Sequence, residues 1–142
     1  MSERVLTLRE LNRATLARQL LLERQQLTAP RAIERLCALQ AQWSPSPYIA
    51  LWSRVRDFDR EQLAHALARK QVVRATLMRI TLHLVSARDF LAIAPLWAAA
   101  RREEFERTGR DADGIAAAIS AAVADEPRTH SELYAQFPDT YS

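Results

Sequence analysis

Hydrophobic residues recur at helical spacing through roughly the first half of the chain. Thr7, followed three residues later by Glu10, forms a capping-box pattern, which predicts that a helix begins there. Apolar stripes further along predict three short helices, over residues 29–41, 47–55 and 60–70. Pro45 and Pro47 end the first of these three, because proline lacks an amide hydrogen and disfavours helical backbone at the residue before it.

The pattern changes between residues 72 and 85, where apolar and polar residues alternate with period two. Such alternation is typical of β-strands, whose successive side chains point to opposite faces of a sheet. Folding the segment about Met78-Arg79 places Arg74 opposite His83 and opposes apolar residues along most of the length; a slip by one residue would destroy that match. We therefore predict a two-stranded hairpin whose polar face carries Arg74, Thr76, Thr81 and His83.

Helical periodicity returns after the hairpin, over residues 87–108 and 111–125, and a further helix begins near residue 129. Three short helices followed by a hairpin form the element order of a winged helix. The predicted fold class is mainly α: a winged helix with one two-stranded β-hairpin and further helices, truncated at the start of a second winged-helix unit. The predicted domains are residues 1–86 (N-terminal helix and first winged-helix unit), 87–126 (connecting helices) and 127–142 (incomplete second unit).

The charge is distributed unevenly along the chain. The 142 residues carry 20 basic and 17 acidic side chains, a formal net charge of +3. Residues 1–80 hold fourteen of the basic and seven of the acidic side chains, so the first part of the chain is strongly basic. This asymmetry favours a polyanionic partner, because cationic side chains release the counterions condensed on phosphates. An arginine-rich composition can also reflect a GC-rich genome, so charge alone does not identify the partner.

Several classes of protein are disfavoured by composition. Cys37 is the only cysteine, which excludes an internal disulfide and disfavours a cysteine-based zinc site; we expect it to be a small buried hydrophobe. The longest uncharged stretch, residues 36–53, is interrupted by polar residues and prolines and does not predict a membrane span. The N-terminus lacks the pattern of a signal peptide. We expect a cytoplasmic protein, associated with the nucleoid when bound to DNA, without a metal or cofactor.

The helix predicted near residues 59–70 is a candidate recognition helix. In helix-turn-helix proteins this element enters the major groove of DNA. Its outward positions carry polar and basic side chains, namely Arg60, Gln62, His65, Arg69 and Lys70. Periodicity alone supports DNA contact and a merely solvated helix face equally.

Four segments resemble a known family of winged-helix DNA glycosylases, the AlkZ/YcaQ group. They are LQAQ at 39–42, SPYIALWSR at 46–54, RATLMR at 74–79 and TLHLV at 81–85. The resemblance covers nearly the whole chain and implies an enzyme that removes alkylated bases, including N7-alkylguanine in interstrand crosslinks. Members of the group contain roughly three winged-helix units, so the resemblance also implies that this chain is truncated.

The resemblance implies a catalytic role for Gln40 and Gln42. The group's motif is Gln-aliphatic-Gln in one branch, with Asp in place of the second Gln in the other, and this chain has Gln40-Ala41-Gln42. A glutamine carbonyl can accept a hydrogen bond from water or lie near a cationic sugar, while its amide holds a second group. Residues two apart in a helix diverge by about 200°, so both glutamines can act on one water only where the helix ends. Without the resemblance, Gln40 would simply cap a helix or face the core, and Gln42 would be solvated.

We expect DNA contacts from the candidate recognition helix and the hairpin. His83 contacts DNA, orients a partner near the glutamines, or is a structural histidine paired with Arg74 or Thr76. The three tryptophans Trp43, Trp52 and Trp97 are expected in the core, with Trp43 the most exposed. The predicted DNA-binding residues are Arg54, Arg60, Gln62, Arg69, Lys70, Arg74, Arg79 and His83.

Three functions remain open at this point. The first is a monofunctional glycosylase, or part of one, that hydrolyses the N-glycosidic bond of alkylated bases such as N7-alkylguanine. The alternatives are a non-enzymatic winged-helix DNA-binding protein resembling a transcription factor, and an inactive truncated fragment. The expected partner is double-stranded DNA, with no membrane and no small-molecule cofactor. Apolar residues that truncation would expose, Leu133, Tyr134 and Phe137, offer a surface for self-association.

Overall fold

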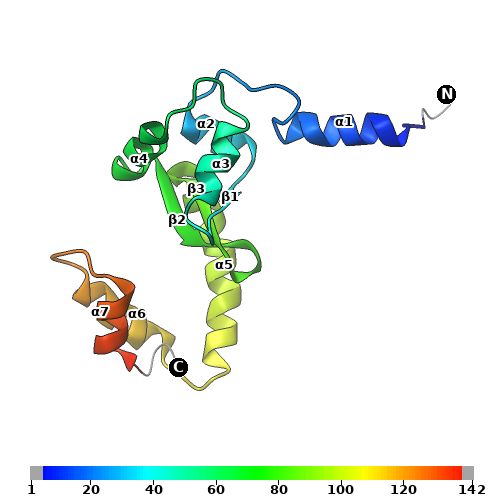
Figure 1. Cartoon of the computed structure of the whole chain (residues 1–142). Coiled ribbons are helices and arrows are strands. Elements are labelled where there is room, and N and C mark those ends of the chain that lie inside the picture. Colours follow the sequence, from blue (N-terminus) through cyan, green and yellow to red (C-terminus); the bar gives the residue numbers. More distant parts are fainter. Residues whose placement is uncertain (1–4, 139–142) are drawn as a thin grey trace. The chain divides into compact units, whose positions relative to one another are not determined.

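The computed structural model describes residues 5–138 and divides the chain into two compact units (Figure 1). The units are Met1–Trp97 and Ala98–Ser142, so the boundary falls within a helix. Each unit is described by itself below. The three-part division at residues 86 and 126 stays a prediction.

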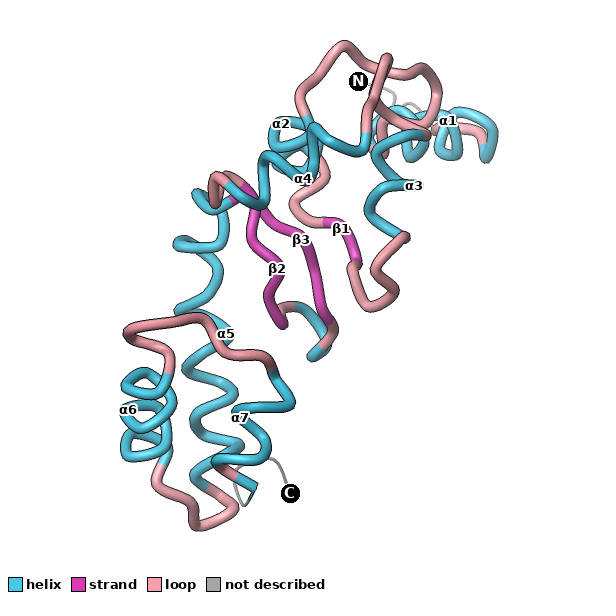
Figure 2. The backbone as a smooth tube through the Cα atoms, turned by 60° about the vertical axis from the view of Figure 1, so that its left-hand side comes forward, coloured by secondary structure: helices cyan, strands magenta, loops and turns pink. Residues whose placement is uncertain are grey.

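The first unit contains the complete element order of a winged helix. Helices α2, α3 and α4 and the three strands follow one another in the order α2-β1-α3-α4-β2-β3, and the strands form an antiparallel sheet in the order β1-β3-β2 (Figures 1 and 2). Its elements in chain order are α1 (Leu8–Arg18), α2 (Ala29–Arg35), β1 (Leu39–Gln40), α3 (Ser46–Trp52), α4 (Arg60–Ala68), β2 (Val72–Thr76), η1 (Met78–Ile80) and β3 (Leu82–Ser86). The predicted mainly α, winged-helix fold is confirmed, and α1 precedes the winged helix as a helix without buried residues.

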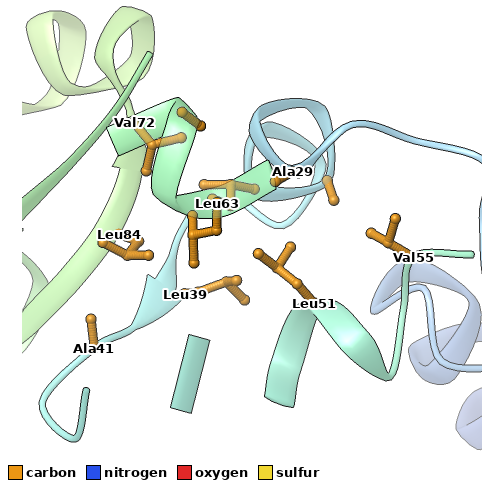
Figure 3. Packing of buried hydrophobic residues seen from close by; sticks show 11 residues of the cluster. Ala29, Leu39, Ala41, Leu51, Val55, Leu63, Val72 and Leu84 are labelled. Carbon is orange, nitrogen blue, oxygen red and sulfur yellow. The ribbon is translucent and has the colours of Figure 1, made fainter. Parts of the chain in front are cut away.

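The core of this unit lies between the sheet and the helices α2, α3 and α4. Ile33 of α2, Leu51 of α3 and Leu63 of α4 are fully buried (Figure 3). Leu39 and Leu84 meet them from neighbouring strands, and a fully buried aliphatic side chain stabilises the fold by about 1.5–3 kcal/mol. The core therefore fixes the position of β1 against β3, and β1 carries the first glutamine of the candidate motif.

The helix predicted over residues 29–41 is much shorter in the structure. α2 ends at Arg35, and Cys37 adopts a left-handed backbone with φ of 71°. A left-handed residue just beyond a helix is a common way to end it, because it turns the chain away from the helix axis. Cys37 is exposed rather than buried, so the expectation of a small buried hydrophobe was wrong.

The predicted pairing of the hairpin was wrong by one residue. Arg74 lies opposite Leu84, and His83 lies opposite Ala75. The cause is the turn: three residues, Met78–Ile80, separate Leu77 from Thr81, and the Leu77 amide donates to the Thr81 carbonyl at 3.1 Å. A two-residue turn would have given the predicted register, but the longer loop moves each side chain of β3 to the other face. The single polar face predicted for the hairpin is therefore not formed.

The second unit is helical. It contains most of α5 (Ala87–Glu106), α6 (Ala112–Ala122) and α7 (His130–Gln136). The Thr129 hydroxyl and the Glu132 carboxylate form the capping box that begins α7. Within residues 5–138, no helix is both long and apolar enough to cross a membrane.

Candidate functional site

Gln40 lies at the edge of the sheet, and Gln42 lies in the bend that follows it. Gln40 is the last residue of β1, and Ala41 continues the pairing by donating its amide hydrogen to the Leu82 carbonyl at 2.7 Å. The segment is therefore a strand edge followed by a bend and not a helix end, so the divergence of about 200° between helical side chains two apart does not apply to the two glutamines.

The hydrogen-bonding pattern changes at Ala41. In a regular ladder the Ala41 carbonyl would accept the Leu82 N–H, but here Oε1 of Gln42 accepts it at 3.0 Å. The Ala41 carbonyl instead accepts from Nη2 of Arg74 at 2.9 Å. The side chain of Gln42 thus replaces a main-chain carbonyl, which directs its oxygen into the sheet and leaves its amide group to donate elsewhere.

Gln40 differs from Gln42 in its surroundings. It is exposed, and no hydrogen bond connects its side chain to any residue in the described part of the chain. Gln40 lies directly opposite His83, a histidine with 6% of its surface exposed. Because Nδ1 of His83 lies 2.9 Å from the Thr81 carbonyl, this nitrogen must carry the hydrogen, so Nε2 of the neutral ring is an acceptor.

His83 forms a hydrogen bond within the protein, but its partner is neither of those expected. It bonds to the Thr81 carbonyl, and the side chains of Arg74 and Thr76 belong to the other face of β2. The register correction therefore moves His83 from the neighbourhood of Arg74 to that of Gln40. Its predicted contact with DNA stays a prediction.

A small cavity adjoins the glutamine segment. Its volume is about 150 Å³, and Ala41 and Arg74 line it together with Tyr48 and Leu63 of the neighbouring helices. Ala41 itself is buried, so the aliphatic residue between the glutamines anchors the segment in the core. Burial of Ala41 and the hydrogen bond to the Gln42 side chain therefore hold two of the three residues, while the side chain of Gln40 is exposed.

The candidate recognition helix corresponds to α4. Leu63 and Ala66 face the core, and four of the predicted DNA-binding residues are exposed on this helix and at its end: Arg60, Gln62, Arg69 and Lys70. Nε2 of Gln62 donates to the Asp57 carbonyl at 3.3 Å. The arrangement is suitable for contact with DNA, which stays a prediction for these residues.

Arg54 and Arg79 lie far apart in the fold and have different surroundings. The guanidinium of Arg54 donates to the Gln19 carbonyl at 2.9 Å, to the Ala50 carbonyl at 2.9 Å and to the Ser53 hydroxyl at 3.0 Å. Burial lowers the pKa of Arg54 from its usual value. Arg54 therefore connects α3 to the end of α1, while Arg79 is exposed in the hairpin loop.

Two tryptophans contradict the expectation that they belong to the core. Trp43 is 63% exposed and Trp52 is 57% exposed, and the guanidinium of Arg24 stacks over the ring of Trp52 at 4.3 Å. Trp43 directly follows Gln42, and the prolines after it already indicated a loop. Trp97 is half-buried.

Among the residues that the structure describes, no group of three histidine, cysteine or acidic side chains could hold a metal ion.

Comparisons with known proteins identify a family for this chain. The model of the AlkZ-like DNA glycosylase family matches residues 33–141. The solved structure of the Streptomyces sahachiroi DNA glycosylase AlkZ is similar at 32% sequence identity and a TM-score of 0.47. That similarity covers 50% of this chain and 19% of the Streptomyces chain. No curated protein sequence matches.

Proposed function

Because the chain belongs to the AlkZ-like DNA glycosylase family, we propose that it provides the catalytic segment of a monofunctional DNA glycosylase. The proposed reaction is hydrolysis of the N-glycosidic bond of an alkylated base, with N7-alkylguanine as the substrate class and crosslinked guanine as an extension of it. The observation that carries the proposal is the Gln40-Ala41-Gln42 segment at the edge of the sheet, in which the side chain of Gln40 is exposed and that of Gln42 is fixed by a hydrogen bond.

The substrate determines how little chemistry the protein must provide. An N7-alkylated guanine is cationic in DNA, so it accepts the electrons of the breaking C1′–N9 bond and leaves as a neutral base. Water forms the new C1′–O bond and gives up a proton to solvent. What the protein contributes is placement of that water and stabilisation of positive charge on the sugar. Neutral glutamines suit this task, since neither side chain needs to take up or release a proton.

The two glutamines have different proposed roles. The exposed side chain of Gln40 is free to accept a hydrogen bond from the attacking water and to place its carbonyl dipole near the developing cation. The Oε1 atom of Gln42 is engaged by the Leu82 N–H, so its amide donates to water or to a sugar or phosphate oxygen. Water would then lie between an acceptor and a donor, which orients it.

Arg74 is the proposed positioning residue for this segment. Its guanidinium bonds to the carbonyl of Ala41, the residue between the two glutamines. It therefore acts on the reaction through the backbone of the motif, in addition to any contact that its remaining donors make with DNA. Double-stranded DNA is the proposed partner, supported by the basic composition of residues 1–80 and the exposed polar face of α4.

The test is release of N7-methylguanine from alkylated duplex DNA by the protein under single-turnover conditions. Gln40→Ala and Gln42→Ala should each abolish release while DNA affinity is retained. Gln136→Ala, an exposed glutamine of α7, serves as the matched control and should release the base at the parental rate. Unchanged release by both motif variants would overturn the assignment of roles.

One observation favours a second candidate function, DNA binding without base release. The bond from Leu82 to Gln42 gives Gln42 a structural role that requires no catalysis. A protein of this kind would bind duplex DNA and leave alkylated bases in place. The same experiment separates the two functions, because binding and base release are measured independently.

A further inference from the structure

A groove of about 890 Å³ lies at the end of the sheet remote from the hairpin loop. Its walls come from α2, from α4 and from the start of α5, and α2 and α4 are neighbours in the fold (Figure 2). Gln71 and Ser86 also line it: Gln71 precedes Val72, the first residue of β2, and Ser86, the last residue of β3, pairs with Val72. The candidate catalytic segment contacts the opposite end of β3, near Leu82, about 14 Å away along the strand. The groove is therefore a separate feature.

Three arginines of the groove have no side-chain partner among the residues that the structure describes. Arg56, Arg69 and Arg88 are exposed and line the groove, and their guanidinium groups make no hydrogen bond or ion pair within residues 5–138. Two carboxylates share this lining. Glu34 is paired with Arg31 at 2.5 Å, which leaves Asp57 as the other negative charge. The groove thus has an excess of positive charge in addition to the hydrogen-bonding side chains of Gln62 and His65.

The groove is much larger than a single phosphate needs, and its arginines come from separate parts of the fold, which together favour an extended anion over a small one. Arg56 follows α3, Arg69 ends α4 and Arg88 lies in the first turn of α5, so the three cations come from three separate elements. A single phosphate is usually held by donors that converge on one point, whereas a nucleic-acid strand presents a series of charges to dispersed cations. In helix-turn-helix proteins the strands that border the recognition helix present their phosphates to residues beside it.

We propose that Arg56, Arg69 and Arg88 bind successive phosphates of one DNA strand in this groove. The inference rests on the proposed binding of duplex DNA, but it does not depend on base excision. It adds Arg56 and Arg88, which lie outside the candidate recognition helix, to the predicted DNA-binding residues. It also gives DNA a second point of attachment, at the end of β3 opposite the glutamine segment.

The test is the salt dependence of binding to a short undamaged DNA duplex, measured by fluorescence anisotropy with the full chain. Each phosphate contact contributes about 0.9 to the slope of log affinity against log salt concentration, so the slope should fall by about 1 for each arginine replaced and by about 3 in the variant R56Q/R69Q/R88Q. The affinity of these variants for DNA at low salt should fall as well, and it should fall by the same factor for duplexes of different sequence.

A matched variant removes the same charge elsewhere. Arg13, Arg18 and Arg35 are exposed and do not line the groove, so R13Q/R18Q/R35Q should change the slope by less than half as much. An equal change in both triple variants would overturn the proposal, as would an unchanged slope in the groove variant.

Inorganic phosphate at equal ionic strength should displace DNA no better than chloride; selective displacement by phosphate would indicate a single-anion site instead. Failure of base release by every variant would count against the proposed enzyme alone, because the readout here is binding.

Discussion

Gln40 lies directly opposite His83 across the β1–β3 pairing, and the two residues come from segments that are distant in the sequence. The imidazole is held by the Thr81 carbonyl, so its position does not depend on Gln40. The exposed carboxamide of Gln40 therefore belongs to a residue that pairs with a histidine held in place by another residue. This pairing connects the stability of the hairpin to the geometry of the candidate site.

His83→Ala should destabilise the protein. The change removes a buried ring and its hydrogen bond to the Thr81 carbonyl, which still accepts from the Leu77 amide; substitutions of this kind cost about 0.5–3 kcal/mol. Urea denaturation measures the free energy of unfolding. His65→Ala, at an exposed position of α4, is the control and should change that free energy by less than about 0.5 kcal/mol. Equal stability of the two variants would mean that the histidine bond contributes nothing.

Gln42→Glu should separate the two functions of the Gln42 side chain. A carboxylate can still accept the Leu82 N–H, so the fold should be as stable as the parent, but the donating amide is lost. Gln42→Leu removes the acceptor too and should lower the free energy of unfolding by about 0.5–1.5 kcal/mol, the usual net contribution of one hydrogen bond, because this bond is exposed and water can replace the lost acceptor. We expect both variants to lose base release and only the leucine variant to lose stability. Parental release by Gln42→Glu would show that the amide has no part in the reaction.

Arg74→Met should reduce the rate of base release more than it reduces DNA affinity. Loss of the bond to the Ala41 carbonyl loosens the glutamine segment, and misplacement of this kind can slow a reaction roughly a hundredfold. The single-turnover rate constant at saturating protein is the measurement, with affinity determined separately. Arg74→Lys, which keeps the charge and one donor group, should recover part of the rate. If both quantities fall in parallel, Arg74 acts on DNA binding alone.

Ile80→Gly should stabilise the protein. Ile80 is 61% exposed and has a φ of 56°, a conformation that costs a β-branched residue about 1–2 kcal/mol and that glycine adopts freely. We expect thermal unfolding to shift upward by several degrees, as about 1 kcal/mol does in a domain of this size. Ile49→Gly is the control: this isoleucine is 54% exposed within α3, where glycine should destabilise the helix by roughly 0.5 kcal/mol. A decrease in stability at both positions would contradict the expectation.

Arg54→Met should lower stability without changing the salt dependence of DNA binding. Its guanidinium already donates to the Gln19 and Ala50 carbonyls. Hydrogen bonds from a charged donor contribute about 1.5–3 kcal/mol when buried, and the partial exposure of this group lowers that contribution. Denaturation and anisotropy titrations test the two halves of the prediction. A smaller salt slope in this variant would instead place Arg54 on the DNA.

The periodicity of apolar residues was sufficient to predict the order of the helices and the two long strands, but it did not predict β1, the short strand that carries Gln40. The helices α2, α3 and α4 and the two long strands were all expected from the spacing of apolar residues. β1 was missed because two residues are too few to show alternation, and the stripe of α2 continues in sequence beyond the point where the helix ends. The left-handed Cys37 that ends it belongs to a residue type with no preference for that conformation.

The register of the hairpin could not be obtained from side-chain matching alone. Matching apolar residues across Met78 and Arg79 gave a consistent but incorrect pairing, because the loop contains no glycine or asparagine to mark its positive-φ positions. The error mattered for function, since it assigned His83 to the face of Arg74. Adding β1 as a third strand explains the observed register: Leu84 must face the core together with Leu39.

The bond from Leu82 to Gln42 has a consequence for exchanges at that position. A side chain that replaces a main-chain carbonyl must have the correct reach, and an aspartate is one methylene shorter than a glutamine. An aspartate at position 42 would alter both the basicity of the group and the way in which the edge strand ends. Gln42→Asp should therefore require compensation in the backbone around Ala41 and Leu82, because this one substitution changes the length and the chemistry of the side chain together.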